Sequence, residues 1–109
     1  PNAKQAIIDA ADTDSVVTGF TTRDTVRGLR NSFSEKYLKL EYSGAAQSEL
    51  TALAAGTNRK AVIDGDTENG FVLAGMSLTH LTKVQPVQEI VEELVSEAER
   101  RLAAAPKLI

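Results

Sequence analysis

The chain has 109 residues, of which 42% are hydrophobic and 25% charged, and its formal net charge is −3. This composition is typical of one globular domain, and the absence of cysteine excludes disulfide scaffolds, Cys-ligated metal sites and cysteine nucleophiles. The mild acidity argues against a non-specific nucleic-acid binder, and no apolar run is long enough for a membrane-spanning helix. We therefore expect a cytoplasmic protein that binds neither nucleic acid nor membrane.

The first twenty residues predict a helix followed by a strand. Residues 3–11 are strong helix formers, and Asn2 lies where an N-cap is expected. Residues 12–20 change to turn formers and then to β-branched residues, which predicts a turn and one short strand around Val16 and Val17.

A second helical pattern covers residues 23–42. Its apolar residues are spaced by three or four positions: Val26, Leu29, Phe33, Tyr37 and Leu40. Ser32 and Glu35 have the spacing of a capping box, which predicts a bend or a restart of the helix there. Gly44 is expected to end it.

Three further apolar segments complete the chain. Residues 46–62 predict helix with an interruption at Gly56, and residues 71–81 are apolar on nearly every side, which predicts a helix buried all round. Residues 86–104 show the clearest helical periodicity, with Pro86 at the first helical position. The sequence thus predicts a mainly α fold with four to six helices and at most one short strand.

Residues 64–70, Asp-Gly-Asp-Thr-Glu-Asn-Gly, are similar to a calcium loop. An EF-hand loop that begins at Asp64 needs glycine at its sixth position and glutamate at its twelfth, and the chain has Asn69 and Gly75 there. We therefore expect a polar turn that caps the following helix.

The remaining polar residues do not form a recognisable catalytic set. His80 is the only histidine, has no nucleophile at a recognisable elbow, and is expected to be structural. Four basic residues are interleaved with three acidic ones, which predicts a solvated, salt-bridged face. The basic residues are Arg27, Arg30, Lys36 and Lys39, and the acidic ones are Asp24, Glu35 and Glu41. We predict no catalytic residue and no metal site.

Gly75 would be costly inside a buried helix. It weakens a helix by about 1 kcal/mol relative to alanine, which favours a close approach of another backbone or of a ligand. With Ala74 and Ser77 it would form a smooth face that carries one hydroxyl, suited to a flat ring or a neighbouring helix.

Several segments, taken in chain order, share a pattern with one known family. Residues 1–8 are similar to its P-N-Y-K-x-x-I-L helix, and residues 14–18 and 26–31 to its D-T-V-V-T and V-R-A-L-K-N segments. Residues 62–78 and 85–91 are similar to its G-D-x-x-x-G-S-V-x-A-G-Q segment and P-V-x-E-I-I helix. The chain therefore resembles the C-terminal region of the nitronate monooxygenase (2-nitropropane dioxygenase) family, which includes the flavin-dependent type II enoyl-acyl-carrier-protein reductases of fatty acid biosynthesis.

The resemblance implies a TIM-barrel flavoprotein parent that binds FMN and acts as an oxidoreductase. Residues 1–109 would be a single helical fragment, in which 1–11 form the helix after the last barrel strand and 12–109 a C-terminal helical extension. A full barrel needs about 200 residues or more. The chain begins at Pro1 without an initiating methionine, which also favours the expectation of a fragment.

The resemblance also implies where the flavin would lie. Gly75, Met76 and Ser77 are the cofactor-binding candidates, although Met76 replaces the family's usual glutamine and Thr79 a usual glycine. The family's phosphate-binding loops and catalytic histidine precede this region, so His80 does not inherit that role. FMN, NAD(P)H and an acyl or nitronate substrate are then expected only in the parent, and the fragment alone is expected to bind no cofactor and to be inactive.

Helices that cover a barrel in the parent would keep exposed apolar faces in the fragment. We therefore expect self-association through those faces. The alternative is a free-standing small helical protein-interaction domain without catalysis. The sequence does not separate nitronate oxidation from enoyl reduction.

Overall fold

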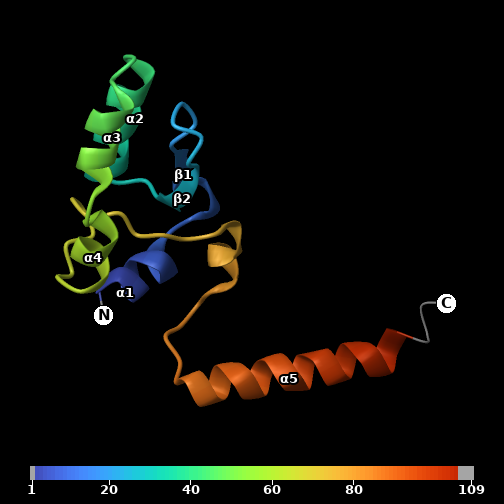
Figure 1. Cartoon of the computed structure of the whole chain (residues 1–109). Coiled ribbons are helices and arrows are strands. Elements are labelled where there is room, and N and C mark those ends of the chain that lie inside the picture. Colours follow the sequence, from blue (N-terminus) through green and yellow to red (C-terminus); the bar gives the residue numbers. More distant parts are fainter. Residues whose placement is uncertain (1, 106–109) are drawn as a thin grey trace.

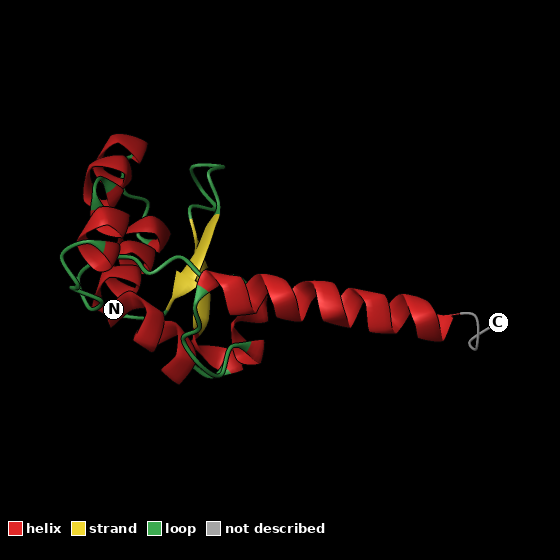
Figure 2. Cartoon of the chain, turned by 90° about the horizontal axis from the view of Figure 1, so that it is seen from below, coloured by secondary structure: helices red, strands yellow, loops and turns green. Residues whose placement is uncertain are grey.

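The computed structural model describes residues 2–105 and is mainly α-helical, as predicted. Most elements form one body, and a long C-terminal helix extends away from it (Figure 1 and Figure 2). No helix within the described residues is both long and apolar enough to cross a bilayer. In chain order the elements are α1 (Asn2–Asp9), the 3-10 turn η1 (Asp12–Asp14), β1 (Ser15–Thr18), β2 (Val26–Leu29), α2 (Ser32–Tyr42), α3 (Gln47–Ala54), α4 (Thr57–Val62), the 3-10 turn η2 (Met76–His80) and α5 (Val87–Ala104).

The prediction of at most one strand is wrong, because residues 26–29 form a second strand. β1 and β2 pair as an antiparallel hairpin in which Ser15 lies opposite Leu29 and Thr18 opposite Val26. The spacing of Val26 and Leu29 fits a helix and a short strand equally well. Pairing with β1 decides between them, because it satisfies the backbone groups of both segments.

Gly28 allows a third extended segment to lie against this hairpin. Leu29 N donates to Val72 O at 2.9 Å, and Gly28 and Leu73 form an isolated antiparallel bridge. A Cβ on Gly28 would lie 2.5 Å from the Phe71 ring and 2.6 Å from Val72 O, so only glycine fits at this crossing. The glycine thus marks close packing in a sheet and not a weak point in a helix.

α2 begins at the predicted restart, although the capping pair is one residue earlier than expected. Ser34 N donates to Asn31 Oδ1, and Asn31 N donates to Ser34 Oγ, both at 2.9 Å. Asn31 Nδ2 also donates to Thr67 O and Gly70 O at 2.7 Å. This asparagine therefore caps α2 and fixes the polar turn of residues 64–70 beside it.

The helix predicted over residues 71–81 is not formed. Residues 71–75 are extended, η2 follows, and Met76 is 69% exposed, so the segment is not buried all round either. The backbone bonds go elsewhere: Phe71 N donates to Thr57 O at 3.0 Å, and Ala74 N donates to Arg27 O at 3.3 Å. Backbone hydrogen bonds to residues distant in the sequence thus replace the local hydrogen bonds of a helix.

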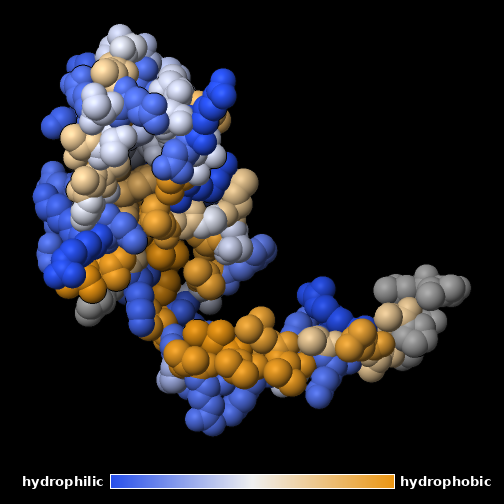
Figure 3. Space-filling model, in the orientation of Figure 1, coloured by the Kyte–Doolittle hydropathy of each residue, from blue (hydrophilic) through white to orange (hydrophobic). Residues whose placement is uncertain are grey.

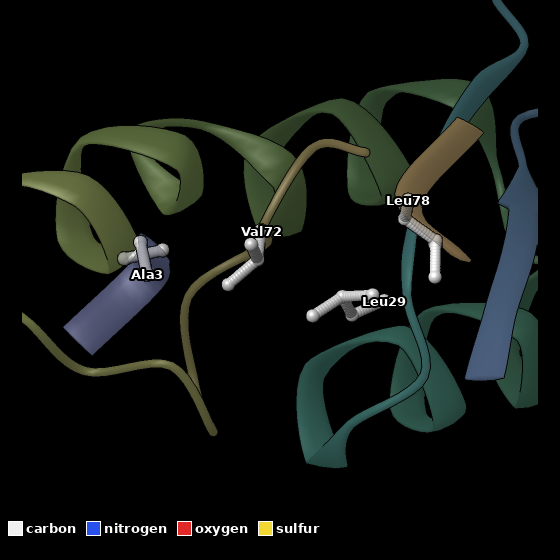
Figure 4. Packing of buried hydrophobic residues seen from close by; sticks show 5 residues of the cluster. Ala3, Leu29, Val72 and Leu78 are labelled. Atoms are coloured by element: carbon white, nitrogen blue, oxygen red, sulfur yellow. The ribbon is translucent and has the colours of Figure 1, made fainter. Parts of the chain in front are cut away.

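Two clusters of buried side chains hold the body together. The first joins α1, β2, α4 and η2 through Ala3, Leu29, Ala61, Val72 and Leu78; Figure 4 labels four of these. The second joins the hairpin, α2 and α3 through Val16, Phe33, Tyr37, Leu50 and Phe71. Phe71 and Val72 lie in different clusters, as expected for neighbours in an extended segment.

α5 agrees closely with its prediction, except that Pro86 is the N-cap residue and not the first helical residue. No residue of α5 is buried. Its apolar side chains form a continuous exposed band in Figure 3, and they include Val87, Ile90, Val91, Leu94 and Val95. The helix forms its own backbone hydrogen bonds, but the described residues bury none of its apolar side chains.

Candidate functional site

The predicted cofactor-binding residues lie on an exposed turn that the buried side chain of Leu78 holds against the body. Gly75 precedes η2 with φ −84° and ψ −179°, and Leu78, only 2% exposed, holds η2 in the first cluster. Met76 and Ser77 are exposed. A Cβ at Gly75 would meet only Ser77 Oγ, at 3.8 Å. The close backbone approach that we considered for Gly75 is therefore not made by any described part of the chain.

A cleft of about 430 Å³ lies between the hairpin and helices α2–α4; we call it the hairpin cleft. Its buried lining is aromatic: the rings of Phe33 and Phe71 pack in a tilted arrangement with centroids 5.3 Å apart, and those of Phe33 and Tyr37 with centroids 6.0 Å apart. The other residues that line it are Thr18, Thr22, Asp24, Val26, Gln47, Thr51, Ala54, Ala55, Gly56, Thr57, Asn58, Arg59 and Leu73. Its volume is in the range of small-molecule pockets.

Tyr37 carries the phenol hydroxyl of this lining. Burial raises the pKa of Tyr37 above its usual value, and a side-chain hydrogen bond with Thr22 partly opposes that rise. The nearby carboxylates of Glu41 and Asp24 raise it further. The phenol therefore stays protonated at neutral pH and can donate a hydrogen bond.

Glu41 holds the hairpin that forms one wall of the cleft. Glu41 is only 2% exposed, and its carboxylate accepts hydrogen bonds from Gly19 N at 3.1 Å, Thr21 N at 2.9 Å and Thr21 Oγ1 at 3.0 Å. A buried carboxylate with several donors is satisfied and geometrically fixed. The cleft wall is thus attached to α2 at the tip of the hairpin as well as along its strands.

The polar turn of residues 64–70 is built around Asp66. Asn69 N donates to Asp66 Oδ1 at 2.9 Å, and Lys60 Nζ lies 3.3 Å from Asp66 Oδ2. The Asn69 backbone bond, followed by the Asn69 side chain and Lys60, lowers the pKa of Asp66 from 3.8 to about 2. Among residues 2–105 no group of three His, Cys, Asp or Glu side chains could hold a metal ion, and the turn caps no following helix.

Two other sequence interpretations need correction. His80 is exposed on η2 and does not lie in an apolar helix. The predicted salt-bridged face does not form, because no ion pair of the described chain joins two of its members. Arg27 is on β2 and donates to Ser15 Oγ at 2.9 Å, whereas Glu41 is committed to the hairpin. Asp24, Arg27 and Arg30 lie in or beside the hairpin, and the other four residues lie on α2, so the seven charges do not share one helical face.

The hairpin cleft was missed by reasoning from sequence. Its residues come from the hairpin, three helices and the segment 71–73, which no single periodicity connects. Gly28 was the available signal, because a glycine between apolar residues also marks a close strand crossing. The cleft and the predicted segment are close along the chain, since Leu73 lines the cleft and Gly75 follows two residues later.

Comparison with known proteins agrees with this architecture. The nitronate monooxygenase family model matches residues 1–97, whereas no curated protein sequence matches significantly. The structure of FabK from Thermotoga maritima matches with a TM-score of 0.88 and 28% identity, covering 100% of this chain and 34% of that chain. A mutant of the same FabK matches with a TM-score of 0.80 and 28% identity, over 100% and 32%. This chain therefore spans about a third of FabK, and it belongs to the nitronate monooxygenase family.

Proposed function

We propose that the chain is the C-terminal part of an FMN-dependent oxidoreductase, acting either as a type II enoyl-acyl-carrier-protein reductase or as a nitronate monooxygenase. The observation that carries the proposal is the match of the whole chain to one third of FabK, combined with the family match. FMN would supply hydride or electron transfer, and the protein supplies binding and orientation. The activity would belong to the complete parent, and the chain alone would be inactive.

We propose that Gly75, Met76 and Ser77 face the flavin in that parent. The fit rests on the open face at Gly75, whose backbone angles any residue adopts and where a Cβ would meet only Ser77 Oγ at 3.8 Å. Nothing else described in the chain requires glycine at this position. A flat ring would fill the space that a larger side chain closes, with the Ser77 hydroxyl available as a hydrogen-bond donor or acceptor.

A chimera tests both statements. This chain replaces the matching third of Thermotoga maritima FabK, and flavin absorbance, NADH-dependent reduction of a crotonyl thioester and oxidation of propyl-2-nitronate are measured. We expect the chimera to bind FMN and the chain alone to bind none. Gly75→Val should weaken FMN binding, whereas Ala52→Val, at an exposed position of α3, should not. A folded chimera without FMN, or equal effects of the two substitutions, would contradict the proposal.

We also propose that the isolated chain self-associates through α5. Its exposed apolar side chains form one band, and large apolar patches on soluble monomers favour association. Sedimentation at micromolar concentration should show oligomers, and Leu94→Glu should shift them toward monomer. A folded monomer of the unsubstituted chain would favour a different counterpart for this helix.

The same exposed band is the observation that favours the second candidate, a helical protein-interaction domain without catalysis. The reading frame of the expressed gene separates the two candidates. An upstream βα-repeating, glycine-rich barrel supports the oxidoreductase, and an unrelated start supports the interaction domain.

A further inference from the structure

We infer that the hairpin cleft binds the aliphatic tail of the parent's substrate, which makes that substrate an acyl compound and not a small nitronate. This inference rests on the proposed function in one respect: the flavin at Gly75 sets the side from which the tail enters the cleft. The binding property itself is carried by the cleft, and it can be measured without a flavin.

The chemistry of the lining favours a neutral, flexible chain. The buried surface consists of Phe33, Tyr37 and Phe71, with Thr18 buried beside them. The charged lining residues, Asp24 and Arg59, are both exposed. A nitronate anion would find no buried positive group in this lining, whereas an alkyl chain gains affinity from apolar contact with the three rings.

The extended segment 71–75 connects the cleft with the proposed flavin side. Alternate residues of an extended segment share one face, so Phe71, Leu73 and Gly75 form a series on one side. Phe71 is buried in the cleft lining, and Leu73 lines the cleft while remaining 44% exposed. Val72 and Ala74, on the opposite side, pack into the first cluster.

This series describes a path without a charged side chain. A substrate whose reacting end lies at Gly75 would pass Leu73 and place its tail against Phe71 and the other aromatic rings. Along this series an alkyl chain would meet the bare face of Gly75 and the apolar side chain of Leu73, with Ser77 Oγ as the polar atom nearest to the Gly75 end.

The wall of the cleft is formed before a ligand arrives. Glu41 fixes Gly19 and Thr21 at the hairpin tip, and Thr22 Oγ1 donates to Gly19 O at 3.1 Å. Ligands bind more tightly to a preorganised site because less conformational entropy is lost. The cleft therefore needs no closing movement to offer an apolar surface.

The test uses the 109-residue chain and a neutral probe, the decanoyl thioester of N-acetylcysteamine. Binding is measured by calorimetry and mapped by amide chemical shifts. Thr51→Trp places a large ring in the cleft wall, and Ser48→Trp is the matched exposed change on the same helix. We expect Thr51→Trp to weaken binding about tenfold or more, and Ser48→Trp to leave it unchanged.

Shifts at Phe33, Tyr37 and Phe71 that saturate with the decanoyl probe and are absent with propyl-2-nitronate would support the inference. Shifts confined to α5, equal effects of the two tryptophans, or nitronate binding in the cleft would overturn it. Failure of the FabK chimera to bind FMN would remove the proposed function and leave this measurement intact, so the two failures are distinguishable.

Discussion

The body of the molecule and α5 contain similar apolar side chains and use them in opposite ways. In the body, residues from the hairpin, four helices and η2 bury one another in two clusters. In α5 the apolar residues recur with helical spacing and none of them is buried. Periodicity therefore specifies a helix and its apolar face, whereas burial of that face depends on the surfaces that the rest of the fold provides.

The first prediction compares the same substitution in the two regions. Leu50 is 0% exposed in the second cluster, and Leu94 on α5 is 67% exposed. Leu50→Ala should lower the free energy of unfolding by about 2–5 kcal/mol, because it leaves a cavity. At a concentration where the chain is monomeric, Leu94→Ala should change it by about 0.5 kcal/mol or less. Urea unfolding of both variants checks this, and equal losses would mean that α5 is packed as tightly as the body.

A second prediction compares two glycines, one in the body and one at the exposed turn. Gly28→Ala places a methyl group 2.5 Å from the Phe71 ring and should destabilise the chain by about 1–3 kcal/mol. Gly75→Ala would meet only Ser77 Oγ, at 3.8 Å, which is ordinary contact, and should change stability by about 0.5 kcal/mol or less. Thermal unfolding measures both. Similar losses would show that Gly75 packs against the chain itself.

The smallest expected effects are electrostatic and concern one carboxylate in each region. Hydrogen bonds from Arg100, followed by those from Arg101, lower the pKa of Glu97 from 4.5 to about 2. The pKa of Asp66 in the body is also lowered to about 2. A lowered folded-state pKa stabilises the native state above the unfolded pKa, and this stabilisation is lost as the pH falls from about 4 to about 2. Asp66→Asn should remove part of the acid sensitivity of body unfolding.

Glu97→Gln should instead reduce only the helicity of α5 near neutral pH, with unfolding of the body unchanged. Circular dichroism at 222 nm reports helicity, and the near-ultraviolet signal of the two tyrosines of α2 reports packing of the body. A loss of both signals in Glu97→Gln would show that α5 and the body unfold together.

The accuracy of the sequence predictions follows the same division. α5, α3 and α4 were predictable because their residues form local backbone bonds and end at recognisable signals such as Gly56. Residues 26–29 and 71–81 were predicted as helix because their apolar spacing is ambiguous over a few residues. Their structure is set by each other, through bonds such as Leu29 N to Val72 O, which no local pattern contains.

The candidate site divides in the same manner. Gly75, Met76 and Ser77 could be selected from sequence because a family pattern marks contiguous residues. The hairpin cleft could not be selected, because Thr18, Tyr37 and Phe71 meet only after the hairpin, α2 and the extended segment have come together. Glu41 illustrates the limit most clearly, since its sequence context is that of an ordinary surface charge and its carboxylate is buried.

The attachment of the hairpin tip to Glu41 also sets the order in which parts of the molecule can open. The Gly19 and Thr21 amides donate to a side chain on α2 and not to the facing strand. Hydrogen exchange at these two amides therefore requires separation of the tip from α2, even while the β1 and β2 ladder stays intact. Slow exchange would show that the amides of the loop are as well protected as those of the β1 and β2 ladder. The cleft wall would then open only when its contact with α2 breaks, and not by fraying from the tip.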